Sequence, residues 1–163
     1  MPKLAMLSSP LQTMAMVLER LRTAPPPQYD PKRPLVPGAP PASHLPLNPV
    51  LYMTLAIDSA APLFRIRSQK GAAGGGMALQ IPVPLNLRQR RRTSIMWILN
   101  AASKRRSKGS GRAMFAHKVA DELIAIVEGK SSIWEKRQGI HRIGVAARIN
   151  VSFSGRKKKF KNI

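Results

Sequence analysis

The sequence predicts a mainly α-helical domain with a protruding two-stranded β-ribbon, a proline-rich extended segment and a basic C-terminal tail. Apolar residues recur with helical spacing in several segments, one segment alternates apolar and basic residues as a strand does, and prolines concentrate near the N-terminal end. The 163 residues suffice for one domain with extensions. We place an N-terminal helix region, a proline-rich segment, a helical domain with its ribbon at 63–82, and a tail at 1–23, 24–47, 48–151 and 152–163.

The chain is strongly cationic, with 28 Lys and Arg against 7 Asp and Glu and a formal net charge of +21. Positive charges in such excess repel one another in a folded protein, so the net charge predicts a polyanionic partner. Nucleic acid is the first candidate and an anionic membrane surface the weaker one. No apolar run approaches the roughly 20 residues of a spanning helix. The absence of cysteine excludes disulfides and thiolate zinc sites.

A first helix is expected over residues 11–21, since Met14, Val17, Leu18 and Leu21 form one apolar stripe. Prolines 25–27 would end it. The first ten residues lack the features of a secretory signal, and we also expect no cleavable transit peptide there.

Residues 24–49 hold ten of the fifteen prolines and are expected to be extended. Two interpretations stay open at this point. The segment is either a linker or an ordered strap laid over a partner surface. The strap interpretation rests on four apolar residues that a spacer does not need: Tyr29, Leu35, Leu45 and Leu47.

A helix over 48–61 is predicted next, capped by Asn48 with Pro49 in its first turn and ended by Pro62. Residues 63–67 alternate apolar and basic, and 77–81 form a weaker second strand. The glycine-rich stretch between them suits a hairpin tip and lacks the GK[ST] of a nucleotide-binding loop. The ribbon carries three cations: Arg65, Arg67 and Lys70.

The central stretch, residues 85–112, contains nine cations and no acidic residue. Its middle is predicted to be a helix that begins at Thr93 or Ser94 and is stopped by Gly109 and Gly111. The apolar stripe consists of Ile95, Ile98, Leu99 and Ala102. The cations are expected before the helix and at its end: Arg88, Arg90, Arg91, Arg92, Lys104, Arg105, Arg106, Lys108 and Arg112.

Two more helices follow. The first, over 112–128, has Phe115, Val119, Leu123 and Ile126 on one face and ends at Gly129. The second opens at an S-x-x-E capping box formed by Ser132 and Glu135 and runs to about residue 151. Its expected core stripe is Ile133, Ile140, Ile143 and Ala147. A neighbouring strip carries Trp134, Arg137, His141 and Arg148.

No catalytic or metal-binding arrangement is visible. The three histidines, at 44, 117 and 141, have no metal-ligand spacing. The acidic residues are scattered singly except for Asp121 and Glu122, which we place on the exposed face of a helix. No nucleophile lies beside a base. The sequence therefore predicts no enzyme, no metal and no cofactor.

The cationic clusters predict RNA binding, since arginine can both grip phosphate and stack on bases. The second face adds Arg137, His141, Arg142 and Arg148, and the tail adds Arg156, Lys157, Lys158 and Lys159. The tail could equally be a nuclear-localisation signal. Trp97 is favoured as a packing residue over a base-stacking one, and for Trp134 both roles stay open.

Three segments together resemble the ribosomal protein S7 family of the small subunit. The first comprises Gln80–Leu85, Arg90–Arg92 and Trp97–Ala102, and the second is Phe115–Ile124. The third comprises Gly129–Ser132, Glu135–Arg137 and His141–Ile143. Their order and spacing are similar to the second half of that family, and the likeness extends over about 47–151.

The resemblance implies a helical domain with a β-ribbon between its third and fourth helices. It implies binding to the 3′ major domain of small-subunit ribosomal RNA and nucleation of head assembly. It also implies a place beside the messenger RNA exit channel, with the ribbon near exit-site transfer RNA and with head and platform proteins as neighbours. No membrane is implied.

The chain departs from the family at both ends. The family's lysine-rich turn after its first helix is not recognisable in 1–10, which puts the usual N-terminal RNA contact in doubt and suggests a shortened chain. A proline segment, a long glycine tip and a basic ending look like a mitochondrial version, located in the mitochondrial matrix. The alternatives are a nuclear architectural DNA-binding protein and a regulator that binds messenger RNA.

Overall fold

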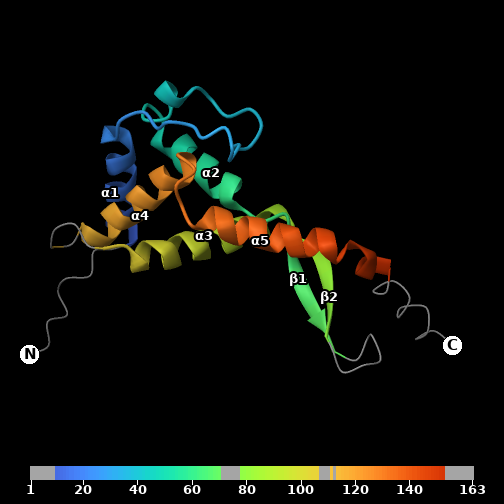
Figure 1. The fold of residues 1–163 in the computed structure, drawn as a ribbon. Helices are drawn as coiled ribbons and strands as arrows, with labels where there is room; N and C mark the ends of the chain where they lie inside the picture. The colour runs from blue at the N-terminus through green and yellow to red at the C-terminus, as the bar shows by residue number, and fades with distance from the viewer. Residues whose placement is uncertain (1–9, 71–77, 107–110, 112, 153–163) are drawn as a thin grey trace, which may run out of the picture.

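The computed structural model describes residues 10–70, 78–106, 111 and 113–152 (Figure 1). Over these residues the chain forms five α-helices, two 3₁₀ turns and one antiparallel ribbon. The elements are α1 (Pro10–Thr23), η1 (Ala42–His44), α2 (Pro49–Ala60), β1 (Phe64–Gln69), β2 (Leu79–Pro84), α3 (Leu87–Lys104), α4 (Met114–Val127), α5 (Ile133–Ala146) and η2 (Arg148–Asn150). The predicted fold class, mainly helical with a two-stranded ribbon, is confirmed.

The helix α4 is the centre of the packing, because α1, α2 and α3 all contact it. Its buried face combines small and branched side chains, which lets neighbouring helices approach closely. Apolar side chains removed from water provide the main driving force for this arrangement. The core residues from the other helices include Val17, Leu21, Tyr52, Leu55, Ile98, Ile133 and Trp134.

The segment between α1 and α2 is an ordered strap that packs over this chain's own helices. Leu45 is fully buried in the core cluster, and Leu35 packs against it. The Arg33 guanidinium donates to the backbone carbonyls of Gly129 and Ser131 just beyond α4. The prediction that Tyr29, Leu35, Leu45 and Leu47 anchor the segment was only partly right, since Leu47 remains 79% exposed.

Replacing Arg33 by alanine is expected to loosen this strap. The change leaves two carbonyls at the end of α4 without their charged donor, and we expect a cost of about 1–3 kcal/mol in the free energy of unfolding. Urea denaturation measures the cost, and limited proteolysis within 24–47 should become faster. Lys32→Ala is the matched control because its side chain is exposed. Equal stability of the two variants would contradict the anchoring role.

The ribbon protrudes from the helices, as Figure 1 shows. Its strands pair antiparallel from Phe64 opposite Pro84 to Gln69 opposite Leu79. It lies between α2 and α3 of the described chain, one helix earlier than the family resemblance implies. The predicted Asn48 cap is confirmed, since its side chain accepts a hydrogen bond from the Leu51 N–H. The glycine tip, 71–76, lies outside the described residues.

The start of α3 was predicted wrongly. The helix begins at Leu87, and Asn86 and Gln89 form a reciprocal capping box. Thr93 and Ser94 instead lie inside the helix, where Ser94 donates to the Ile57 carbonyl on α2. The arginines predicted before the helix therefore occupy its first two turns. Its end at Lys104 comes before either predicted glycine stop, and Gly109 lies outside the described residues.

The boundaries of α4 agree with the prediction to within two residues, and Gly129 follows its end with a positive φ of 73°. The start of α5 at Ile133 is also confirmed, but the capping box is not, because Ser132 makes no side-chain cap. Ser131 supplies the local contact instead, accepting from the Ile133 N–H. The helix ends at Ala146, earlier than predicted, and η2 continues it.

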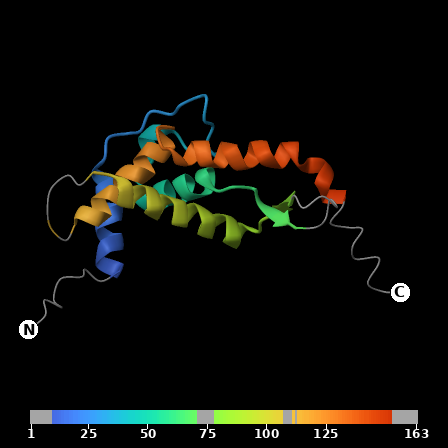
Figure 2. The same cartoon turned by 60° about the horizontal axis from the view of Figure 1, so that its bottom comes forward.

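Several predicted core positions are exposed. Ile95, Leu99, Phe115 and Ile143 lie at the edges of their helical faces and keep 38–43% of their surface. On α3 and α5, which flank the helical core (Figure 2), the buried stripe is narrower than the apolar residues suggest. On α4 only Phe115, in the first turn, departs in this way. The buried stripe of α4 is carried by Ala116, Ala120, Leu123 and Val127.

Candidate nucleic-acid interface

The described cations predicted to bind RNA divide into two groups by exposure. Nine are exposed on the ribbon, on and just after α3, and along α5 and η2: Arg65, Arg67, Lys70, Arg88, Arg92, Lys104, Arg106, Arg142 and Arg148. Five are half-buried: Arg90, Arg91, Arg105, Arg137 and His141. The remaining six lie outside the described residues: Lys108, Arg112, Arg156, Lys157, Lys158 and Lys159.

The ribbon presents two of these arginines together. Arg65 and Arg67 are two positions apart on β1, so both side chains point to the same face. Both are exposed, while Ile66 between them is half-buried. The alternation predicted from sequence is therefore confirmed, and it gives the ribbon one cationic face.

The outer face of α3 combines cations with apolar side chains. A shallow hollow of about 570 Å³ lies along it, lined by Leu87, Arg88, Arg91, Arg92, Ile95 and Met96. Because these arginines lie on the helix, their spacing is fixed by its geometry. Arg88 and Arg92 are one turn apart and both exposed.

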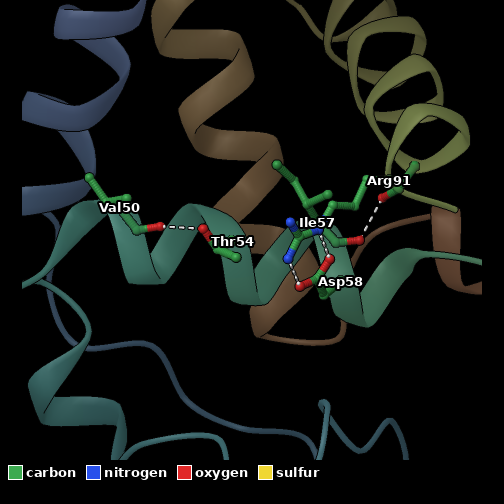
Figure 3. Close-up of polar contacts among 6 residues, drawn as sticks. Val50, Thr54, Ile57, Asp58 and Arg91 are labelled. Carbon is green, nitrogen blue, oxygen red and sulfur yellow. Dashed lines mark hydrogen bonds and ion pairs between the residues drawn. The ribbon is translucent and has the colours of Figure 1, made fainter. Parts of the chain in front are cut away.

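Arg91 is held by this chain and not free. Its Nε and one terminal nitrogen donate to the two carboxylate oxygens of Asp58, each at 2.7 Å (Figure 3). These hydrogen bonds and the negative charge of Asp58 raise the pKa of Arg91. The two-point geometry joins α3 to α2, so the principal partner of Arg91 is a neighbouring helix.

Arg105 is likewise committed to the fold. It pairs with Glu122 on α4, whose carboxylate is buried and also accepts from Ser131 Oγ at 2.6 Å. The expectation that Asp121 and Glu122 share an exposed face was therefore wrong for Glu122. A single carboxylate links the end of α3, the middle of α4 and the start of α5.

Arg137 and His141 hold the connection between α2 and β1. Arg137 Nε donates to the Ala61 carbonyl, and the Leu63 N–H donates to His141 Nε2, both at 3.3 Å. Burial, followed by the charge of Arg90, lowers the pKa of Arg137. Burial and the charges of Arg137 and Arg90 lower the pKa of His141.

This lowered pKa predicts a pH dependence. Between the folded and unfolded pKa values of His141 the unfolded chain binds more protons. The contribution of His141 to stability is therefore complete above its usual pKa of about 6.5 and is lost as the pH falls below it. We expect the urea midpoint to fall between about pH 7.5 and pH 5 more in the wild type than in His141→Gln. Equal falls would contradict this assignment.

Both tryptophans serve packing. Trp134 is 2% exposed, and its indole N–H donates to the Ile126 carbonyl at 2.9 Å, so it cannot stack on a base. Trp97 packs against the core cluster, and the Lys136 ammonium lies 5.9 Å from its ring centroid. The packing role favoured for Trp97 is confirmed.

Sequence reasoning missed two lysines beside α3. Lys136 lines a hollow of about 270 Å³ together with Trp97, Lys104 and Ser132. Lys130 lines an adjacent hollow that Lys104 also borders. In the sequence each is a single lysine outside the basic runs, so nothing there marks it as part of a cationic surface. Their grouping follows only from the packing of α5 against α3.

Two other features bear on the site. Among the described residues no three His, Cys, Asp or Glu side chains are grouped to hold a metal ion. In the same part of the chain, no helix is both long enough and apolar enough to cross a membrane.

Comparison with known proteins identifies the fold. A family model described as ribosomal protein S7p/S5e matches residues 39–148. The chain is 58% identical over 146 residues to the small ribosomal subunit protein uS7m of Neurospora crassa, an alignment covering 90% of this chain and 47% of that protein. It is 31% identical over 107 residues to the bacterial uS7 of Azotobacter vinelandii, covering 66% of this chain and 62% of that protein.

A second bacterial relative, uS7 of Albidiferax ferrireducens, is 33% identical over 107 residues, with 66% of this chain and 61% of that protein covered. The chain thus spans about half the length of the fungal relative and about six tenths of the bacterial ones. The family is structural and non-enzymatic, which agrees with the absence of a catalytic motif from the sequence. The family model, the high identity to a mitochondrial relative and the helical fold with its ribbon agree, and the chain belongs to the ribosomal protein S7 family in its mitochondrial form.

Proposed function

We propose that this chain is a structural constituent of the mitochondrial small ribosomal subunit, located in the mitochondrial matrix, and that it binds small-subunit ribosomal RNA. The observation that carries the proposal is the S7 match over 39–148 together with 58% identity to a protein named a small ribosomal subunit protein. The exposed cations of the ribbon, α3 and α5 support it. None of the ion pairs in the described part of the chain uses those nine side chains.

The mechanism is scaffolding. The helical core holds cations in fixed positions, and these neutralise phosphates where RNA helices converge. We assign the RNA target to the 3′ major domain, the role to assembly of the subunit head, and the position to the messenger exit channel near exit-site transfer RNA. Head and platform proteins would be the neighbours. Family membership supports these finer assignments.

Sucrose-gradient fractionation of lysate and purified mitochondria tests the proposal. The protein should sediment with the mitochondrial small subunit and with the intact ribosome. Magnesium depletion, which dissociates subunits, should move it to the small-subunit fraction. Recovery only in free or chromatin fractions would reject the proposal and leave messenger RNA regulation or DNA architecture as the explanation of the cations.

Salt dependence provides a direct physical prediction. If six to ten phosphates are neutralised, affinity for a ribosomal RNA fragment should fall by about a thousandfold or more between low and moderate salt. Filter binding or fluorescence anisotropy at several salt concentrations measures the slope. A folded RNA junction should also compete far better than duplex DNA of equal charge. A slope near zero, or equal competition by DNA, would contradict RNA binding through these cations.

A further inference from the structure

A hollow of about 300 Å³ lies where the ribbon leaves the helices. The ribbon begins between α3 and α5, as Figure 2 shows, and the hollow has lining residues from all three elements. Its volume is at the lower end of the roughly 300–1,000 Å³ of small-ligand pockets, which gives room for one ring system. We call this hollow the ribbon pocket, and its lining includes Phe64, Leu85, Gln89, Arg92, Thr93 and Ile140.

The ribbon pocket combines apolar surface with positive charge. Phe64, Leu85 and Ile140 are its half-buried apolar residues, and Arg65 and Arg92 are exposed arginines at its border. None of the described lining residues is acidic, and neither arginine takes part in an ion pair of the described chain. Apolar surface favours a ligand that has apolar faces of its own, and unpaired arginines favour a ligand attached to negative charge.

Two neutral side chains of α3 add hydrogen-bonding groups to the ribbon pocket. Gln89 Oε1 accepts from the Asn86 N–H in the capping box, so the Gln89 amide NH₂ is left to donate, and no described residue accepts from it. Thr93 Oγ1 donates to the Gln89 carbonyl at 2.9 Å and keeps its lone pairs to accept. Because the two residues are one turn apart, the helix presents a donor and an acceptor side by side.

The aromatic ring of the ribbon pocket has a fixed position. Phe64 stacks on the His141 ring, with centroids 5.1 Å apart and an angle of 29° between the planes. It also lies so close to Gly144 on α5 that a Cβ at this glycine would collide with the ring. These contacts orient Phe64 before any ligand arrives. Aromatic rings and arginine guanidinium planes are the groups on which proteins stack unpaired RNA bases.

We propose that the ribbon pocket binds one unstacked nucleobase of RNA. The base lies against Phe64 and the apolar wall, its edge meets the Gln89 amide and the Thr93 hydroxyl, and its phosphates stay outside the pocket beside Arg65 and Arg92. This recognition goes beyond phosphate contact, because a duplex keeps its bases paired and cannot supply one. The ribosomal origin of the RNA rests on the proposed function, whereas the nucleobase chemistry does not.

Narrowing the ribbon pocket without changing its charge tests the proposal in the full chain. Thr93→Leu adds apolar bulk to the lining and removes the hydroxyl acceptor, and leucine is a good helix former. Affinity for a short single-stranded RNA should fall about tenfold, the size of one lost base–aromatic stack. Affinity for an RNA duplex of equal charge should stay unchanged. Fluorescence anisotropy measures both affinities.

Thr54→Leu is the matched control. Thr54 is a half-buried threonine of α2 that donates to the Val50 carbonyl at 2.8 Å, one turn back, as Thr93 does on α3 (Figure 3). This variant should bind both RNAs like the wild type. The ribbon pocket is overturned if Thr93→Leu binds the single strand as well as Thr54→Leu does, or if it binds single strand and duplex with equally weakened affinity.

A comparison of nucleotides in the wild type decides even if Thr93→Leu does not fold. Nuclear magnetic resonance follows the Gln89 side-chain amide, and Gln89→Glu identifies the signal because glutamate retains the capping box. At least one of adenylate, guanylate, cytidylate and uridylate should shift this signal. Ribose 5-phosphate, which has the phosphate but no base, should not. Equal shifts from nucleotides and ribose 5-phosphate, no shift from either, or a shift from poly-glutamate alone would overturn the nucleobase pocket.

The gradient fractionation described above separates this pocket from the proposed function. If the protein sediments with the small subunit but Thr93→Leu and the nucleotides have no effect, the pocket is wrong and the function is unaffected. If the nucleotides shift Gln89 but the protein is recovered only in free fractions, the nucleobase pocket stands and its ribosomal origin is overturned together with the proposed function.

Discussion

Replacement of Glu122 by alanine is expected to cost about 3 kcal/mol or more in the free energy of unfolding, the largest single effect on stability that we predict. The Glu122 side chain is 4% exposed and accepts from Arg105 and Ser131. Alanine leaves the Arg105 guanidinium half-buried without its counter-charge. It also removes the acceptor of Ser131 Oγ, which itself orients the first N–H of α5. Urea denaturation measures the loss.

A comparison with Glu128 isolates the effect of burial. Glu128 also pairs with a neighbouring cation, Lys130, but that lysine is 70% exposed. We expect Glu128→Ala to cost less than about 1 kcal/mol, as exposed ion pairs do. Glu122→Gln should fall between the two alanine variants, because the amide oxygen still accepts from Ser131 while the charge on Arg105 is uncompensated. Equal costs for Glu122→Ala and Glu128→Ala would contradict a linking role for Glu122.

Local signals were sufficient for much of the fold. Asn48 followed by Pro49 predicts a helix start because both act within one turn. Gly129 predicts a helix end because the left-handed backbone conformation found there favours glycine. The alternation at residues 63–67 predicts a strand because side chains of a strand point to opposite faces in turn. Each of these depends on neighbours in sequence, so the chain alone reveals them.

The start of α3 was predicted wrongly although a local sequence signal for it is present. Asn86 and Gln89 form a capping box, but the arginines that follow suggested a flanking basic run. Arginine is a good helix former, and this propensity holds in α3 even though cations in the first turns oppose the helix dipole. The capping box at Asn86 and Gln89 marks the true start of the helix in the sequence.

The division of the cations into exposed and anchored groups could not be read from sequence. Asp58 lies 33 positions before Arg91, and Glu122 lies 17 positions after Arg105. Only tertiary packing brings these partners together. The strap presents the same limit, because Arg33 bonds to a carbonyl 96 positions away. Composition predicts that cations bind RNA, and the fold decides which are available.

This division sets the strongest prediction for RNA binding. From sequence, the run Arg90–Arg92 is the natural target for substitution, but it mixes the exposed Arg92 with the half-buried Arg90 and with Arg91, which is paired with Asp58. A sharper variant replaces Arg88, Arg92 and Arg106 by glutamine, since all three are exposed and none has an ion-pair partner among the described residues. We expect affinity for a ribosomal RNA fragment to fall about a hundredfold, and the salt slope to decrease by roughly 3.

A control variant with the same loss of three charges replaces Arg22, Lys32 and Lys118, which lie on α1, in the strap and on α4. If net charge alone attracted the RNA, both variants would weaken binding equally, because long-range attraction follows total charge. If fixed phosphate contacts dominate, only the α3 variant should change the salt slope, since each lost contact ceases to release a counterion. Thermal melting of both variants should stay close to the wild type, because neither set contributes to the core. Equal slopes would reject α3 as the RNA-contacting surface and move the interface to the ribbon and α5.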